Sequence, residues 1–265
     1  MKKIILLVAA LSVAFSVSAA EKKAEKSEKS AKNGLTTALN AGLSLTDGNS
    51  ETLAANGALI TEGEKEGLGS VLAGIEANYG ENTQTTETVD ETTGATETTD
   101  ATERTVNNAK AYANVKKTLS PKTYSYADGK MIYDEIADID YRAIAGLGLG
   151  AYLVKNDKRE LSVEAGTSYV WEKVADASDD YLALRFAERY VCQATKTAKL
   201  FESLEYLPEA SDFDSYLLTG EIGVEAAIND HLSLRVVLQD KYDSTPAPGS
   251  ERNDLSLIAG LGWTL

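Results

Sequence analysis

Side chains that commonly carry enzyme chemistry are scarce in this 265-residue sequence. His231 is the only histidine and Cys192 the only cysteine, so an intrachain disulfide and any paired-cysteine metal or redox motif are excluded. A hydrolytic site needs a nucleophile or water, a base and an orienting group held close together. His231 instead follows Asn229 and Asp230 in a short polar segment that indicates a solvated turn. We therefore expect no enzyme activity, no catalytic residue, no cofactor and no bound metal.

Acidic side chains outnumber basic ones and gather between the apolar segments of the chain. Residues 34–265 hold 19 basic and 38 acidic side chains, a net charge of −19. This balance argues against nucleic acid as a partner, because nucleic-acid binding relies on neutralising phosphates. It is compatible with surface contacts that divalent cations mediate. The spacing of the acids between segments matches no catalytic pair, and we interpret them as solvated or cation-bridged: Asp134, Glu135, Asp138, Asp140, Asp176, Asp179, Asp180, Asp212, Asp214, Asp240 and Asp243.

A second set of charged residues alternates with apolar residues inside the segments. Because alternate residues of a strand point to opposite faces, these charges are expected to line the interior of a closed sheet. Opposite charges on neighbouring strands could pair and plug a narrow interior. Alternatively, separate basic and acidic walls could orient small polar solutes in a channel. The candidate lumen-lining residues are Glu76, Lys110, Lys116, Arg142, Glu160, Glu164, Arg185, Arg189, Glu221, Glu225 and Arg235.

The elements that carry these residues are segments with a hydrophobic period of two. In residues 255–265 every second side chain is apolar, and residues 35–45 show the same pattern. Twelve such segments follow one another through residues 34–265, and an even number of strands suits a single-chain membrane barrel. The sequence therefore predicts an all-β fold, a transmembrane antiparallel up-and-down β-barrel of about 12 strands.

The links between the segments indicate the same fold. Links after even-numbered segments are short, whereas most links after odd-numbered segments are longer and more acidic. Short periplasmic turns and longer external loops are typical of outer-membrane barrels, and a soluble β-sandwich gives no reason for this asymmetry. The longest link, residues 81–105, is built almost entirely of Thr, Glu, Asp, Ala and Gln. We expect a long, acidic, solvated external loop, either simply hydrophilic or able to collect cations.

The amino-terminal residues have the pattern of an export signal. Residues 1–20 combine Lys2 and Lys3 with an apolar run and small residues at the cleavage position. Residues 21–33 are charged and lack large apolar side chains. We therefore predict a cleaved signal peptide, a periplasmic leader and a barrel in the outer membrane of a Gram-negative cell. Its partners there are expected to be membrane lipid and lipopolysaccharide.

The final segment is expected to close the barrel and to direct its assembly. An unpaired strand edge is not tolerated in lipid, so the last strand must pair with the first. Leu261, Trp263 and Leu265 lie on its apolar side, and Trp263 suits the periplasmic interface. We predict that these three residues form the signal that the barrel assembly machinery recognises. One acid, Glu188, interrupts the apolar face of an earlier segment.

Several short motifs are spread along residues 35–265: LSLTDGNS at 43–50, YDE at 133–135, DYR at 140–142, SLEYLP at 203–208, SDFD at 211–214 and DKYDSTPAPG at 240–249. In these stretches the chain resembles the DUF481 family, the YdiY-like or salt-induced outer-membrane proteins. The resemblance implies an outer-membrane barrel and brings no catalytic residues with it. The chain departs from the family pattern in residues 81–105, in Glu188 and in Leu265, which stands where such barrels normally end in an aromatic residue.

Two functions are compatible with such a barrel. The first is a porin-like, small-solute or ion channel with a mixed-charge lumen. The second is a plugged barrel with a structural or surface-interaction role, which would act through acidic, cation-binding external loops. Conductance across a planar bilayer separates the two, because a plugged barrel gives no stepwise current.

Overall fold

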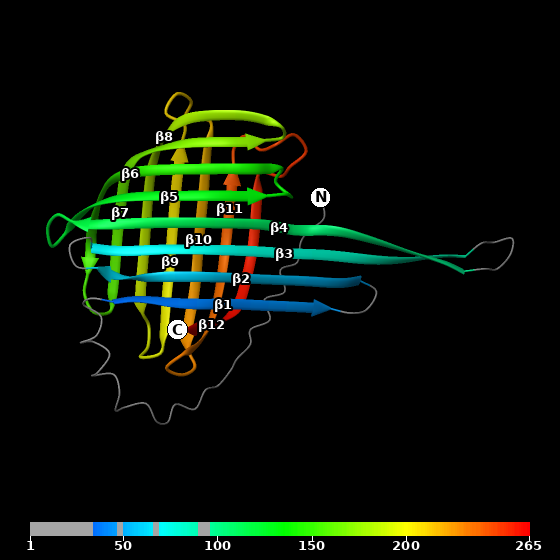
Figure 1. The fold of residues 1–265 in the computed structure, drawn as a ribbon, viewed down its shortest axis with the longest axis horizontal. Coiled ribbons are helices and arrows are strands. Elements are labelled where there is room, and N and C mark those ends of the chain that lie inside the picture. The colour runs from blue at the N-terminus through cyan, green and yellow to red at the C-terminus, as the bar shows by residue number, and fades with distance from the viewer. Residues whose placement is uncertain (1–33, 47–49, 66–68, 90–95) are drawn as a thin grey trace.

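The computed structural model describes residues 34–46, 50–65, 69–89 and 96–265. The predicted signal peptide and leader, residues 1–33, lie outside the described residues. The described residues form twelve strands that pair in antiparallel order into one closed barrel (Figure 1). The strands are β1 (Gly34–Thr46), β2 (Ser50–Lys65), β3 (Gly69–Val89), β4 (Thr96–Thr118), β5 (Thr123–Asp134), β6 (Ile139–Lys155), β7 (Arg159–Val174), β8 (Ala177–Gln193), β9 (Ala198–Pro208), β10 (Tyr216–Ala227), β11 (Leu232–Asp243) and β12 (Asn253–Thr264). The predicted all-β barrel of about 12 strands is confirmed. Within this part of the chain, no helix is long and apolar enough to cross a membrane.

β12 closes the barrel by pairing with β1, as the alternation of the final segment predicts. The two strands pair only over residues 38–41 and 261–264. On its other side, β12 pairs with β11 along almost its whole length. The seam between β1 and β12 is therefore the shortest ladder among the strand pairs that the structure describes.

The two ends of the barrel differ in their links. We call the end that carries the links 119–122, 156–158, 194–197 and 228–231 the short-turn end, and the opposite end, with the links 209–215 and 244–252, the long-loop end. One predicted loop at the long-loop end is much shorter than expected. Residues 175–180 were expected to connect two strands, but only Ala175 and Asp176 do so, with φ angles of 48° and 65°. A two-residue turn with positive φ fits the twist of a hairpin, so Asp179 and Asp180 belong to β8.

Residues 81–105 are not the irregular loop that we predicted. β3 continues to Val89 and β4 begins at Thr96, so the two strands extend past the barrel wall as a hairpin (Figure 1). The absence of an apolar face led to the prediction of a loop. A two-stranded ribbon in water needs no such face, because its backbone groups pair with each other and Thr favours strands. The hydroxyls of Thr83 and Thr102 lie 2.9 Å apart across this ribbon.

The outer face of the barrel is apolar and bordered by aromatic side chains. On β12, Leu257, Leu261 and Trp263 point outward and are 49–72% exposed. At the long-loop end, the rings of Tyr206, Tyr216 and Tyr242 form a row with centroids 5.4 and 5.6 Å apart. At the short-turn end, His231 stacks on Trp263, with ring centroids 5.8 Å apart. An apolar band between aromatic rows is typical of transmembrane barrels.

Candidate functional site inside the barrel

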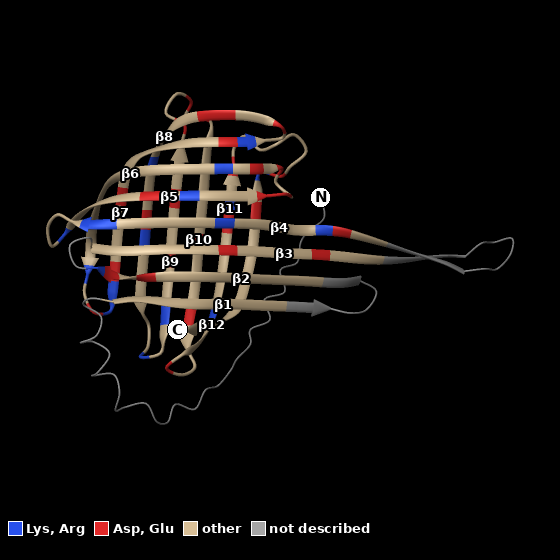
Figure 2. Ribbon diagram, viewed as in Figure 1, with Lys and Arg blue, Asp and Glu red and all other residues tan. Residues whose placement is uncertain are grey.

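The eleven predicted lumen-lining residues all occupy positions on the inner face. Cross-strand partners share a face, and the register connects these positions around the barrel, from Glu76 and Lys110 on β3 and β4 to Glu225 and Arg235 on β10 and β11. Figure 2 shows basic and acidic residues side by side along the barrel strands. They divide into four groups: a network on β4–β9, pairs that cross the barrel at the long-loop end, a group around a small cavity, and three residues near the short-turn end.

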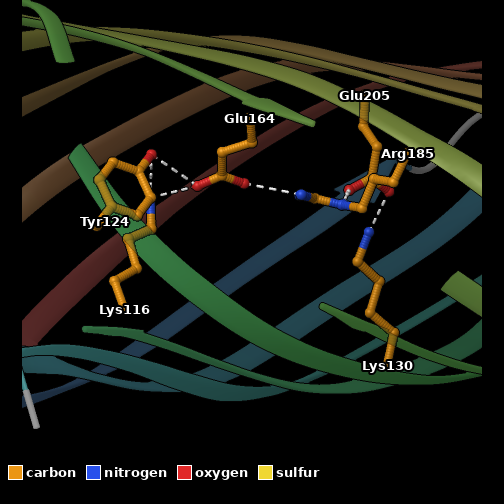
Figure 3. A network of polar contacts seen from close by, with 6 residues as sticks. All are labelled: Lys116, Tyr124, Lys130, Glu164, Arg185 and Glu205. Atoms are coloured by element: carbon orange, nitrogen blue, oxygen red, sulfur yellow. Dashed lines mark hydrogen bonds and ion pairs between the residues drawn. The ribbon is translucent and has the colours of Figure 1, made fainter. Parts of the chain in front are cut away.

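The charge network consists of Lys116, Lys130, Glu164, Arg185 and Glu205 (Figure 3). Lys116 Nζ lies 2.7 Å from Glu164 Oε1, and Arg185 Nη1 lies 2.8 Å from Glu164 Oε2. Arg185 Nε donates to Glu205 Oε2 at 2.8 Å, and Lys130 also pairs with Glu205. Arg185 is only 7% exposed. Two carboxylates therefore lie between three cations, and the pairing offsets the loss of hydration that burial imposes.

Glycines on β6 make room for this network. Gly148 and Gly150 have no side chain on the inner face, so Tyr124 and Tyr126 of β5 lie across β6. A Cβ at Gly150 would be 2.3 Å from the Tyr124 ring, and a Cβ at Gly148 would be 2.6 Å from the Tyr126 hydroxyl. By crossing β6, Tyr124 reaches β7 and donates a hydrogen bond to Glu164 at 2.9 Å.

Polar atoms beside the network are buried without a hydrogen-bond partner in the described part of the chain. They are the hydroxyls of Tyr126 and Ser168 and both carboxylate oxygens of Asp128. The guanidinium of Arg185 lies over the Tyr126 ring, 4.9 Å from its centroid. An acidic side chain without a donor is costly in such a place, so Asp128 contributes less to stability than the paired acids do.

Two ion pairs cross the barrel at the long-loop end. Arg142 of β6 pairs with Glu172 on the neighbouring strand, and its Nη2 donates to Asp243 Oδ2 of β11 at 2.9 Å. β6 and β11 are five strands apart in the ring, so the second contact joins facing walls. Lys241 of β11 lies 3.9 Å from Asp134 of β5 in the same way. These wall-to-wall pairs constrict the lumen on this side.

An apolar layer separates the charge network from Arg142. Ile144, Val170, Ala183 and Leu207, from β6 to β9, are buried against one another inside the barrel. The sequence pattern did not predict this layer, because alternation alone assigns polar residues to the inner face. Half of the interior is therefore filled by side chains, and we call this half, lined by β4–β9, the network half.

The other half of the interior, lined by β1–β3 and β10–β12, holds a cavity of about 70 Å³. Small or short side chains such as Asn40, Ala58 and Gly260 form much of its wall, and we call this part the small-residue half. Glu221 and Arg235 also line the cavity. Glu76 is the third predicted lining residue at this cavity. Its carboxylate lies 3.0 Å from the Lys110 ammonium.

The remaining predicted residues lie near the short-turn end. Glu225 pairs with Lys199 at 3.5 Å. Glu160 and Arg189 form no ion pair with any residue that the structure describes. The structure therefore places these three on the inner face but outside the charge network.

The sequence interpretation missed several members of the site. Lys130 and Glu205 lie on β5 and β9, where apolar and polar residues do not alternate regularly in the sequence. On β9, Phe201 and Leu207 point inward like Glu205, so polarity does not alternate there. Asp243 was predicted to be a solvated rim acid, yet it pairs with Arg142. No sequence signal identifies a contact between strands that are far apart in the ring.

The acids outside the barrel wall show a different arrangement. Glu135, in the link after β5, accepts hydrogen bonds from Arg104 at 2.5 Å and from Asn107. These two donors hold the pKa of Glu135 below its ordinary value. No cluster of three or more His, Cys, Asp or Glu side chains suited to a metal ion occurs in the described ranges.

Comparisons with known proteins agree with this architecture. The model of a family described as "Protein of unknown function, DUF481" matches residues 39–265. The NanC porin structure has a TM-score of 0.52 at 8% identity, and the match covers 87% of this chain and 100% of that one. The KdgM porin gives 0.45 at 7% identity (88% and 99% covered), and the translocator domain of autotransporter NalP from Neisseria meningitidis gives 0.41 at 13% (89% and 91%). No curated protein matches the chain. The likeness to the NanC porin shows the fold of an outer-membrane barrel.

Proposed function

This chain belongs to the DUF481 family, and from that premise we propose that it is an outer-membrane barrel that conducts ions or small polar solutes through a narrow, mixed-charge lumen. The location is supported by the outer face. From Leu255 to Trp263, the outward side chains of β12 are all apolar. Eight residues of strand rise about 26 Å, which at a tilt of about 45° crosses close to 20 Å of hydrocarbon.

The contrast between the two interior halves carries the proposal of a channel. The network half is filled, whereas the small-residue half retains a cavity with Glu76, Glu221 and Arg235 on its wall. A pathway through this half would run beside side chains of both charges. Such a lining binds small polar species weakly enough to release them. The size of the cavity favours ions and small solutes over large ones.

The wall-to-wall pairs give this pathway a constriction. Arg142–Asp243 and Lys241–Asp134 join opposite walls at the long-loop end. Arg142 and Asp134 are buried, so salt screens these pairs less than it would screen exposed ones. We infer that their separation widens the lumen.

Conductance in planar bilayers tests the proposal. The folded wild-type protein should give small stepwise currents, and the double variant Asp134→Asn/Asp243→Asn should give steps several times larger. Glu225→Gln, which removes a 3.5 Å pair at the opposite end, is the matched control and should leave the step size unchanged. Heat-modifiable migration on gels would verify that each variant is folded. Absence of stepwise current from both folded proteins would refute the channel.

The alternative is a plugged barrel with a surface-interaction role. It is supported by the apolar layer inside the network half and by the hairpin of β3 and β4, which projects beyond the barrel (Figure 1). If the alternative holds, the protein conducts nothing, and removal of residues 81–105 abolishes cation-dependent binding to surfaces while the barrel stays folded.

A further inference from the structure

The outer face of the barrel has a hollow of about 740 Å³ that crosses β6–β9. Small side chains, Ala151 and Ala165, form its floor, and Leu149 borders it on one side. Phe186 and Tyr206 border it on the other, with their rings stacked at a centroid distance of 6.5 Å. The volume lies within the range of about 300–1,000 Å³ that is usual for ligand sites.

The hollow lies on the outer side of the wall that carries the charge network inside. Gly150, whose inner side the Tyr124 ring covers, adds no side chain to the hollow. The outward neighbours Ala151 and Ala165 are too short to fill the space. The outer surface is therefore concave and apolar here.

One charged side chain points outward in this hollow. Glu188 of β8 lies opposite Val163 on β7 and Leu204 on β9, and all three line the groove. Glu188 forms no hydrogen bond or ion pair with any residue in the described ranges. No Lys or Arg of the described chain lines the groove either. A carboxylate on a lipid-facing surface is expensive unless a counter-charge reaches it.

We propose that the groove binds a phospholipid whose acyl chain lies on the apolar floor and whose primary ammonium headgroup pairs with Glu188. This inference rests on the proposed membrane location. A lipid is the occupant because the face lies between the two aromatic rows, where lipid must cover it. The ammonium is required because the only charge in the hollow that faces outward is negative.

The depth of Glu188 suits a headgroup contact. β8 ends at Gln193, five residues beyond Glu188, at the short-turn end. Five residues of strand tilted by about 45° correspond to about 12 Å of depth, which is near the boundary between headgroups and acyl chains. A lipid headgroup can therefore reach this carboxylate.

Native mass spectrometry of the full chain in detergent tests the proposal. Phosphatidylethanolamine, phosphatidylcholine and phosphatidylglycerol with identical acyl chains are the probes. Phosphatidylethanolamine should be retained best, because phosphatidylcholine has no N–H donor and phosphatidylglycerol has no cation. In Glu188→Gln its apparent affinity should fall about fivefold or more, to the level of the other two lipids. Glu202→Gln, which removes an outward acid of β9 that does not line the groove, is the matched control and should bind as wild type.

Three results would overturn the assignment. The first is equal retention of the three lipids, and the second is an unchanged affinity for phosphatidylethanolamine in Glu188→Gln. The third is a protein dimer that dissociates when lipid is added, because a second copy of the chain would then occupy the groove. Heat-modifiable migration and insertion into liposomes are measured separately for each variant. Failure of those two assays in the wild type contradicts the membrane location itself rather than the lipid site.

Discussion

The two halves of the barrel interior differ in how their side chains fill the space. The network half uses long side chains, such as Arg185 and Tyr124, that reach over neighbouring strands and bind Glu164. The small-residue half uses glycine, alanine and asparagine and keeps a cavity. It also contains the seam, where a Cβ at Gly42 would be 2.3 Å from the Ala259 carbonyl oxygen. Small residues there let the first and last strands approach each other.

This difference predicts different sensitivities to substitution. In the network half each charge depends on its partners, so the loss of one leaves another buried without compensation. In the small-residue half few charged side chains depend on one another, and added volume is harmful only where backbones lie close, as at Gly42. The following changes test this contrast, from the largest expected effect to the smallest.

Deletion of residues 263–265 should abolish membrane insertion. The seam pairs only residues 38–41 with 261–264, so the deletion removes half of the ladder that closes the barrel. Leu265→Phe, which keeps the ladder, should be tolerated. Heat-modifiable migration after refolding into liposomes measures both. A truncated chain that inserts normally would contradict the predicted assembly role of Leu261, Trp263 and Leu265.

Arg185→Met should lower the free energy of unfolding by about 3 kcal/mol or more, because Glu164 and Glu205 lose a buried partner. Urea titration of the folded barrel in detergent gives this value. Asp128→Asn is the matched control in the same region. It should be neutral or slightly stabilising, because the Asp128 oxygens have no hydrogen-bond partner within the described chain. Equal losses in the two variants would mean that the charges act without specific pairing.

Gly148→Ala should destabilise the barrel by about 1–3 kcal/mol, since overpacking forces neighbours to move. Its new methyl group would be 2.4 Å from the Ala165 carbonyl oxygen. Gly57→Ala on β2 should be neutral, because a Cβ there would lie on the outer face with Ala41 and Ala77 and would meet no atom within 4 Å. The same urea titration compares the two variants. A neutral Gly148→Ala would show that β6 does not need the space that its glycines provide.

Acidification should loosen the base of the projecting hairpin through Glu135. Its folded pKa is below the ordinary value, so its pairing with Arg104 stabilises the structure above the ordinary pKa and is lost as the pH falls through the folded one. The Glu135 amide donates to the Asn107 carbonyl at 3.0 Å, and its hydrogen exchange reports the change. In Arg104→Gln the transition should move to higher pH. An unmoved transition would assign the shift to Asn107 alone.

The sequence pattern was sufficient for the strands and for most of the faces. Alternation identifies the inner positions of Glu164, Arg185 and Glu221 because their neighbours along the strand are apolar. It fails on β9, where Phe201 and Leu207 are buried inside. It also fails for residues 81–105, where a ribbon in water has no buried face to reveal it. The pairing of Arg142 with Asp243 depends on the curvature of the closed sheet, which no local pattern contains.

The hairpin of β3 and β4 also extends the molecule well beyond the barrel wall. Residues 81–89 add a ribbon of about 30 Å to β3, which is comparable to the thickness of the hydrocarbon core that the strands cross. The ribbon continues the wall strands β3 and β4, with a shift in their register between Gly80 and Glu81, so a force on its outer part is carried along both strands toward Glu76 and Lys110. A molecule that binds the outer part of the ribbon would therefore be linked mechanically to the lumen-lining residues of β3 and β4.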